Sequence, residues 1–305
     1  MDKLLDFLKK KYKKKYRILN HIIPLDFGNK ECSGYTLAPE LVDTNIWYQD
    51  FKNNLFILKK KEYLPICRLS DGEYNFMFGL QPPVFELNIM YIRLLLSFIK
   101  WKFFYPQFNA ATMIGVSSGD YSRAEQKKAA NNYKTLIKII SQRGYLAMHL
   151  TLSIRQFQQR YHPNLKKYWE ENSIVVTMKN YVPFYFVYHM LSSKDRFELF
   201  ESKRILLITG ANVDKTDKVK ERLTNEGALN VSTILISKNR SLYDKIDINS
   251  FIGNIDLVLI AAGIGKPNIL LQCEPLSVPC IDIGFMFEVY ANPSLGQNRQ
   301  FCKLD

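Results

Sequence analysis

The stretch RILLITGAN, residues 204–212, decides the fold. Its apolar run Ile205–Ile208 leaves no polar face, which predicts a strand at residues 204–209 that is buried on both sides of a parallel sheet. The run ends in Gly210-Ala211-Asn212, and the polar segment 216–226 that follows has the composition of a surface helix. A strand, a turn and a helix in this order form the repeating unit of an α/β fold.

The same alternation extends along the chain in both directions. The sequence predicts further strands at residues 64–69, 112–116, 145–150, 173–177, 230–236, 255–261 and 278–283. It predicts helices at residues 84–105, 122–141, 181–191, 216–226 and 267–272. This pattern predicts a Rossmann-like, mostly parallel sheet with helices on both faces. No repeat or long linker divides residues 20–305, so we expect a single domain there.

Residues 1–19 form a separate feature, a basic amphipathic segment. Met1 to Arg17 contains seven Lys, one Arg and two Asp, and so holds +6 of the formal net charge of +13. Leucines and tyrosines recur at helical spacing among these lysines. The segment is either a solvated surface helix or a helix that lies on an anionic membrane. The second alternative predicts membrane contact through residues 1–17.

Cysteine usage and the apolar segments indicate a location. The five cysteines are widely spaced without a CxxC pair, which argues against a zinc ribbon or a disulfide framework. Reduced thiols, together with an N-terminus unlike a signal peptide, predict a cytoplasmic protein. The most apolar long stretch, residues 87–105, contains three cationic side chains, so we expect a core helix there and not a membrane span.

The end of the predicted strand 64–69 holds the first candidate site. Asp71 and Glu73 flank Gly72, whose conformational freedom allows the two carboxylates to turn to one side. Paired carboxylates are hard oxygen ligands, so both are candidate ligands of Mn²⁺ or Mg²⁺ that could bridge a diphosphate. Arg68 is a candidate phosphate clamp. A plain acidic turn is the alternative, because Asp-Gly is a common turn pair.

Two later strand ends hold further candidates. Gly263, Gly265 and Lys266 follow the strand 255–261, and glycines at this place leave N–H groups to face an anion. The spacing fits neither a Walker A loop nor a dinucleotide fingerprint, and a tight strand-to-helix turn is an equal alternative.

The last predicted strand ends in Asp282, a candidate donor-binding residue. Glu288 follows six positions on and is a candidate general base for an acceptor hydroxyl. A solvated side chain on a terminal helix is the alternative for Glu288. The four histidines lack metal-ligand spacing, and no GxSxG motif is present, so a serine hydrolase is not expected.

The pattern Arg68-x-x-Asp71-Gly72-Glu73 resembles the R-x-G-D-G-E-F signature of the GT-D-fold glycosyltransferases. Residues 237–244, 257–267 and 281–290 resemble later segments of that family, in the same order. The blocks together extend over about residues 64–292. The chain departs from the family pattern at two positions, where Ser70 replaces a usual Gly and Phe285 replaces a usual His.

The resemblance implies a hexosyltransferase-like enzyme that moves a sugar from a nucleotide-diphosphate donor, with a UDP-sugar favoured. It implies Mn²⁺ or Mg²⁺ at Asp71 and Glu73, and a donor near Arg68, Gly72 and Asp282. By position, Lys238 and Asn239 also join the donor site, together with Gly263, Gly265 and Lys266. The acceptor would be a bacterial surface glycan or a lipid-linked oligosaccharide, which suits a peripheral enzyme on the inner face of the plasma membrane.

A binding module without enzymatic activity is the alternative function. Tyrosine, tryptophan and lysine side chains interleave in residues 161–169, as they do in single-strand nucleic-acid binders. Nucleic acid is not favoured, because the chain contains no helix-turn-helix, zinc-finger or RNP-type motif.

Overall fold

The computed structural model describes residues 21–27, 30–36, 44–58, 61–78, 123–148, 169, 171–174, 176, 180–297 and 302–305. The predicted N-terminal helix at residues 1–19, the helix at 84–105 and the strand at 112–116 lie outside these residues. Among the residues described, no helix combines the length and the apolar character needed to cross a bilayer.

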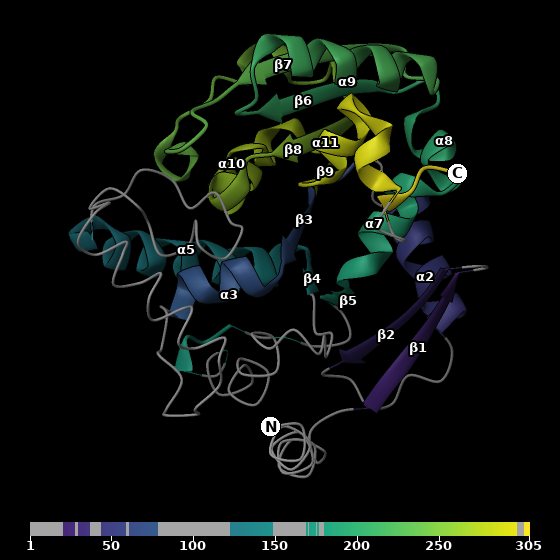
Figure 1. Cartoon of the computed structure of the whole chain (residues 1–305). Helices are drawn as coiled ribbons and strands as arrows, with labels where there is room; N and C mark the ends of the chain where they lie inside the picture. The colour runs from purple at the N-terminus through teal and green to yellow at the C-terminus, as the bar shows by residue number, and fades with distance from the viewer. Residues whose placement is uncertain are drawn as a thin grey trace, which may run out of the picture.

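A parallel sheet of seven strands forms the centre of the described chain (Figure 1). The strands are β3 (Leu64–Leu69), β4 (Tyr145–Met148), β5 (Tyr181–Pro183), β6 (Arg204–Thr209), β7 (Asn230–Leu235), β8 (Leu257–Ala261) and β9 (Pro279–Asp282). Their order across the sheet is β5-β4-β3-β9-β8-β6-β7, and every neighbouring pair is parallel. The Rossmann-like α/β class predicted from the sequence is confirmed.

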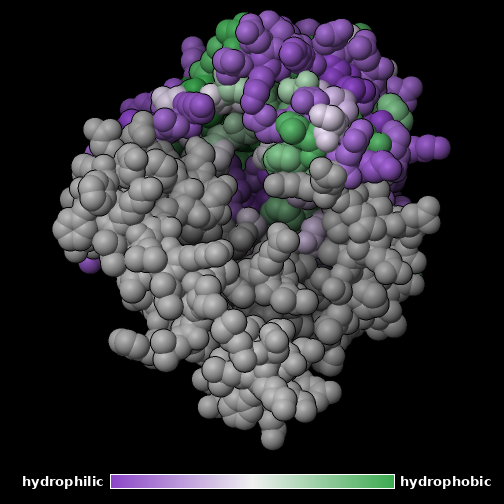
Figure 2. All heavy atoms as spheres, viewed as in Figure 1, coloured by the Kyte–Doolittle hydropathy of each residue, from purple (hydrophilic) through white to green (hydrophobic). Residues whose placement is uncertain are grey.

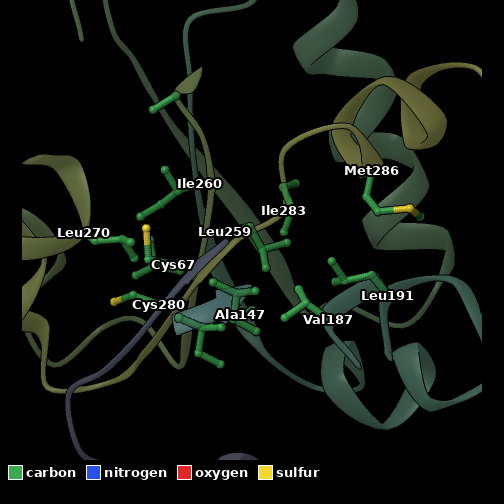
Figure 3. Packing of buried hydrophobic residues seen from close by; sticks show 14 of the residues in the cluster. Cys67, Ala147, Val187, Leu191, Leu259, Ile260, Leu270, Cys280, Ile283 and Met286 are labelled. Atoms are coloured by element: carbon green, nitrogen blue, oxygen red, sulfur yellow. The ribbon is translucent and has the colours of Figure 1, made fainter. Parts of the chain in front are cut away.

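The central strands are apolar because helices cover both of their faces. In β6 and β8, the side chains of Ile205–Ile208 and Val258–Ile260 have no exposed surface. Figure 3 shows the core on both sides of the sheet, with Leu270 on one side and Val187, Leu191 and Met286 on the other. Continuous apolar runs are therefore required here, and an alternating pattern would bury polar side chains.

The helices form two layers. One layer contains α3 (Asp71–Phe78), α5 (Arg123–Arg143) and α10 (Lys266–Gln272), with α5 packed against the other two. The second layer contains α7 (Phe184–Ser192), α9 (Val213–Asn225) and α11 (Met286–Ala291), with α11 packed against both others. Helix α5 faces the core with residues at helical spacing: Ala129, Tyr133, Ile137 and Ile140.

This arrangement fixes the place where a ligand can bind. The neighbouring strands β3 and β9 are followed by helices of opposite layers, α3 and α11. The same holds for β8 and β6, which lead into α10 and α9. In open parallel sheets, such a divergence opens a crevice at the carboxyl ends of the strands.

Residues 21–58 form smaller elements that lie before the first predicted strand. Strands β1 (His21–Phe27) and β2 (Lys30–Thr36) form an antiparallel hairpin, in which Phe27 pairs with Lys30. Helix α2 (Thr44–Asn53) continues into a π-helical turn, Asn54–Leu58. Trp47 and Phe51 of α2 pack edge-on against Phe186 and Tyr145, respectively, and so join the helix to the main core.

Two predicted elements differ in the structure. In the predicted strand 173–177, the described residues Ser173, Ile174 and Val176 are not in a strand. Ser173 has a left-handed φ of 54°, and the Ile174 N–H donates to the Trp169 carbonyl, so this segment turns. The predicted helix 181–191 is also wrong in its first turn, because the strand β5 occupies 181–183. A residue before proline favours extended backbone, and Pro183 itself has ψ 137°, so α7 begins only at Phe184.

Asp195 at the start of α8 (Asp195–Phe200) is expected to make stability depend on pH. Burial would raise the pKa of this carboxyl group from 3.8, but hydrogen bonds from Lys52 and Tyr48, each 2.6 Å, outweigh it and lower the pKa. A carboxyl group with a lowered pKa stabilises the fold above its unfolded pKa, and this contribution is lost as the pH falls through the folded pKa. The free energies of unfolding in urea of the native chain and of Asp195→Asn should show their full difference at about pH 6, and a smaller difference below about pH 4. An equal difference at both pH values would contradict this account.

Candidate functional site

Charged side chains gather at the carboxyl ends of β3, β9 and β8. Four of them are almost fully buried: Arg68 with 3% exposure, Glu73 with 8%, Lys266 with 4% and Asp282 with 1%. They come from segments up to 214 residues apart in the chain. Figure 2 shows a hollow near the middle of the molecule. In the same view, Figure 1 shows β3 and β9 at this place, between α10 and α11.

Arg68 and Asp282 join the two central strands. The Arg68 side chain donates from Nε to the Asp282 carbonyl at 2.6 Å and from Nη2 to Oδ1 at 3.2 Å. The backbone N–H of Arg68 also donates to Oδ2 at 3.2 Å. Three donor groups of one residue therefore hold one aspartate, which fixes the guanidinium against the end of β9.

Lys266 lies between two carboxylates. Its Nζ is 2.5 Å from Glu73 Oε1 and 3.1 Å from Asp282 Oδ2. Lys266 is the first residue of α10, and Glu73 lies in the first turn of α3. The ammonium group thus ties together the segments that follow β8, β3 and β9.

The second oxygen of Glu73 closes the N-terminus of α3. The Ser70 backbone N–H and the Ser70 hydroxyl both donate to Glu73 Oε2 at 2.9 Å. The Ser70 carbonyl accepts the Tyr74 N–H at 3.0 Å, so Ser70 is the residue before the helix. A glutamate three positions after a capping serine that bonds the serine N–H is one half of a capping box.

The four charges balance one another. Burial disfavours every charged form, yet the neighbouring opposite charges outweigh it and lower the pKa of Glu73 and of Asp282. For the same reason the pKa values of Arg68 and Lys266 are raised, with Asp282 the largest favourable contributor for both. All four groups are therefore charged at neutral pH, and the cluster has no net charge.

The surroundings of Arg68 fit it closely. The guanidinium carbon lies 5.1 Å from the Phe184 ring centre and 4.7 Å from that of Tyr188, both on α7. Gly284 has a φ of +40°, and a Cβ there would lie 1.6 Å from Arg68 Nη2. A glycine is therefore required after β9, both for its backbone conformation and for the space that Arg68 occupies. Among the described residues, Arg68 Nη1 is buried without a hydrogen-bond partner.

The loop after β7 is held in a defined shape. Asp244 accepts hydrogen bonds from the Ser237 N–H at 2.6 Å and from the Ser237 hydroxyl at 2.8 Å. A Cβ on Gly210, at the end of β6, would lie 2.8 Å from the Lys238 Cα, so the loop crosses the end of β6 at close range. Lys238 is exposed, and it forms no ion pair with any described residue.

The same loop is fastened to α10. The Ser241 hydroxyl donates to the Ala262 carbonyl at 2.9 Å, and Asn268 Nδ2 donates to the carbonyls of Ser241 at 3.0 Å and Asp244 at 2.8 Å. Gly265 makes this contact possible, because a Cβ there would lie 2.1 Å from Ser241 Oγ. No specific role was predicted from the sequence for Ser241 or for Asn268, whose hydrogen bonds place the loop.

The glycine turn after β8 is a short 3₁₀ segment, Gly263–Gly265. The Gly265 N–H donates to the Ala262 carbonyl at 2.9 Å, so it is committed within the turn. The Lys266 side chain turns inward to Glu73 and Asp282. Anion binding by this turn stays a prediction, and it would fall to N–H groups other than that of Gly265.

Glu288, the candidate base, forms its ion pair outside the cluster of four buried charges. It is on α11, and its Oε2 is 2.7 Å from Lys215 Nζ on α9, with both side chains more than a third exposed. The pair joins the helices that follow β9 and β6. Phe285, the residue before α11, packs partly buried against the core.

The residues present do not fit a divalent metal bound through Glu73. One oxygen of Glu73 is held by Lys266 and the other by Ser70, so neither points to open space. Asp71 is the first residue of α3, and its side chain lies outside the described parts of the chain. Within those parts, no three His, Cys, Asp or Glu side chains lie close enough together to hold a metal ion.

The chain was compared with family models, with curated proteins and with solved structures, and none of the three comparisons gave a match.

Proposed function

We propose that the chain is a glycosyltransferase that takes a nucleotide-diphosphate sugar, with a UDP-sugar favoured, in the crevice at the carboxyl ends of β3, β9, β8 and β6. The acceptor we propose is a surface glycan or a lipid-linked oligosaccharide. One observation supports this most strongly: the four sequence blocks that resemble the GT-D family contact one another at one edge of the sheet.

The contacts between the blocks are specific. Arg68 bonds Asp282, and Glu73 bonds Lys266, so the first block meets the third and the fourth. Ser241 of the second block bonds the Ala262 carbonyl of the third. Segments about 20 to 214 residues apart thus share one place. Strand ends at such a divergence are where α/β proteins bind nucleotides.

The proposal gives the exposed cation of the second block a direct role. Lys238 is held on a fastened loop beside Gly210, with no partner ion among the described residues. A lysine in this position is a point charge for a phosphate oxygen. The buried charges of Arg68, Lys266 and their carboxylates have no net charge, so they position the loops and do not themselves attract the donor.

Glu288 is the residue we propose to accept the proton of the acceptor hydroxyl. Its ion pair with Lys215 holds a partly exposed carboxylate on α11, the helix that follows β9. An attack on the sugar from the face opposite the leaving diphosphate, assisted by this base, inverts the anomeric centre.

Release of a nucleoside diphosphate from a panel of nucleotide-diphosphate sugars tests the proposal. The native chain should release it from at least one sugar, faster when a glycan acceptor is added. Lys238→Ala should raise KM about tenfold, because one charge-assisted contact with phosphate is lost. Lys203→Ala is the matched control: it removes the same charge at the amino end of β6, at the opposite edge of the sheet, and KM should not change.

A KM in Lys238→Ala that equals the KM of the native chain would contradict the proposed donor site. If no sugar of the panel is consumed, and RNA binds with a steep salt dependence instead, the binding-module alternative replaces the proposal.

A further inference from the structure

We propose that the Lys266 ammonium takes the place of a cation between Glu73 and Asp282, and that Glu73 is not a metal ligand in the native chain. Removal of the Lys266 side chain should therefore open a binding site for a divalent cation. This inference does not rest on the proposed function, because cation binding is measured without a donor.

The geometry around Lys266 Nζ is that of an ion held by carboxylate oxygens. Glu73 Oε1 and Asp282 Oδ2 approach the nitrogen at 2.5 and 3.1 Å, from two different segments of the chain. The side chains of all three residues are no more than 10% exposed. Divalent cations in proteins are held by the same type of oxygen, at about 2.0–2.6 Å.

Each carboxylate oxygen of the native cluster already has a partner. A divalent ion bound to Glu73 Oε1 would have to displace the ammonium, which would then lie buried beside a like charge. The other oxygen, Oε2, is held by two donors of Ser70 that close α3. Arg68 already donates hydrogen bonds to both carboxylate oxygens of Asp282. Two positive and two negative groups thus already balance one another.

The experiment counts bound Mn²⁺ from the electron paramagnetic resonance signal of the free ion. Lys266→Ala leaves two buried carboxylates and space, so we expect it to bind one Mn²⁺ per chain more than the native chain. Lys266→Met removes the same charge but fills the space, and should bind less. Lys266→Ala with Glu73→Gln should lose the gained ion.

The single change Glu73→Gln tests the native chain itself. It keeps the shape of the side chain, and we expect native and Glu73→Gln chains to bind equal amounts of Mn²⁺. A folded Glu73→Gln chain that loses a bound Mn²⁺ would overturn the proposal, as would a folded Lys266→Ala chain that gains none.

Loss of folding in Lys266→Ala is also decisive. A cation that binds only the folded state stabilises it by mass action, so Mn²⁺ should then restore the circular dichroism of the folded chain. An alanine chain that stays unfolded in saturating Mn²⁺ would count against the proposal.

Discussion

Asp282→Ala is expected to lower the free energy of unfolding by about 3–5 kcal/mol, because it leaves buried cations without their partner. Asp282 is 1% exposed and accepts hydrogen bonds from Arg68, and it also pairs with Lys266. In the variant, two buried cations face Glu73 alone. The midpoint of urea unfolding should fall sharply, with a smaller fall for Asp282→Asn, which keeps the shape of the side chain and one of its two acceptor oxygens.

The control for this prediction is a second Arg–Asp pair in the same sheet. Asp256 binds Arg204 through two side-chain hydrogen bonds of 2.9 Å, but about a third of each side chain is exposed. Water screens this pair and solvates the arginine that remains, so Asp256→Ala should shift the midpoint much less. Equal shifts for the two alanine variants would contradict the prediction that burial makes the loss of Asp282 more costly.

Gly265→Ala is expected to detach the loop of residues 237–244 and to cost about 1–3 kcal/mol of stability through overpacking. The φ of Gly265 is −74°, so alanine meets no conformational strain, and the whole effect is steric. The new Cβ would lie 2.1 Å from Ser241 Oγ and 2.4 Å from the Ser241 backbone carbon. Amide hydrogen exchange of the loop should quicken about tenfold or more as its contacts open.

Two further variants separate this effect from a general one. Gly253→Ala introduces strain at a φ of +75° but meets no atom within 4 Å, so stability should fall while the loop exchanges as in the native chain. Ser241→Gly added to Gly265→Ala removes the clashing Oγ and Cβ, and part of the loss should be recovered. Unchanged exchange in Gly265→Ala would mean that this contact does not hold the loop.

The strands of the sheet could be predicted because each is a continuous apolar run between turn residues. β3 and β6 have the predicted limits, and β7, β8 and β9 lie within theirs. The strand β5 was missed because three residues, Tyr181–Pro183, carry no periodicity of their own. Its position is set by the pairing of Leu146 with Tyr181 in the neighbouring strand, which is a tertiary contact.

The candidate site could be located from the sequence, but the contacts of its charges could not. Arg68, Glu73, Lys266 and Asp282 were all singled out, each at the end of a strand. Their pairing with one another depends on strand order, which places β3 next to β9 although the two are far apart in the chain. A lysine after a glycine turn suggests an anion, whereas Lys266 turns into the protein.

A local sequence pattern also indicates the contact between Ser70 and Glu73. Ser70-x-x-Glu73 directly before the apolar residues of α3 is the pattern of a capping box. It predicts that the Glu73 side chain accepts a hydrogen bond from the Ser70 N–H at the start of the helix. Ser70 is also the position at which the chain departs from the family pattern. The serine hydroxyl thus supplies a hydrogen bond to Glu73 that a glycine cannot make.

The most direct test of the central claim, that the carboxyl edge of the sheet binds a nucleoside-diphosphate donor, is thermal unfolding in a panel of nucleotides. A ligand of the folded state raises the melting temperature by mass action. We predict that at least one nucleoside diphosphate raises it for the native chain and for Lys203→Ala, and raises it less for Lys238→Ala. No rise with any nucleotide, or an undiminished rise in Lys238→Ala, would contradict a donor site at this edge.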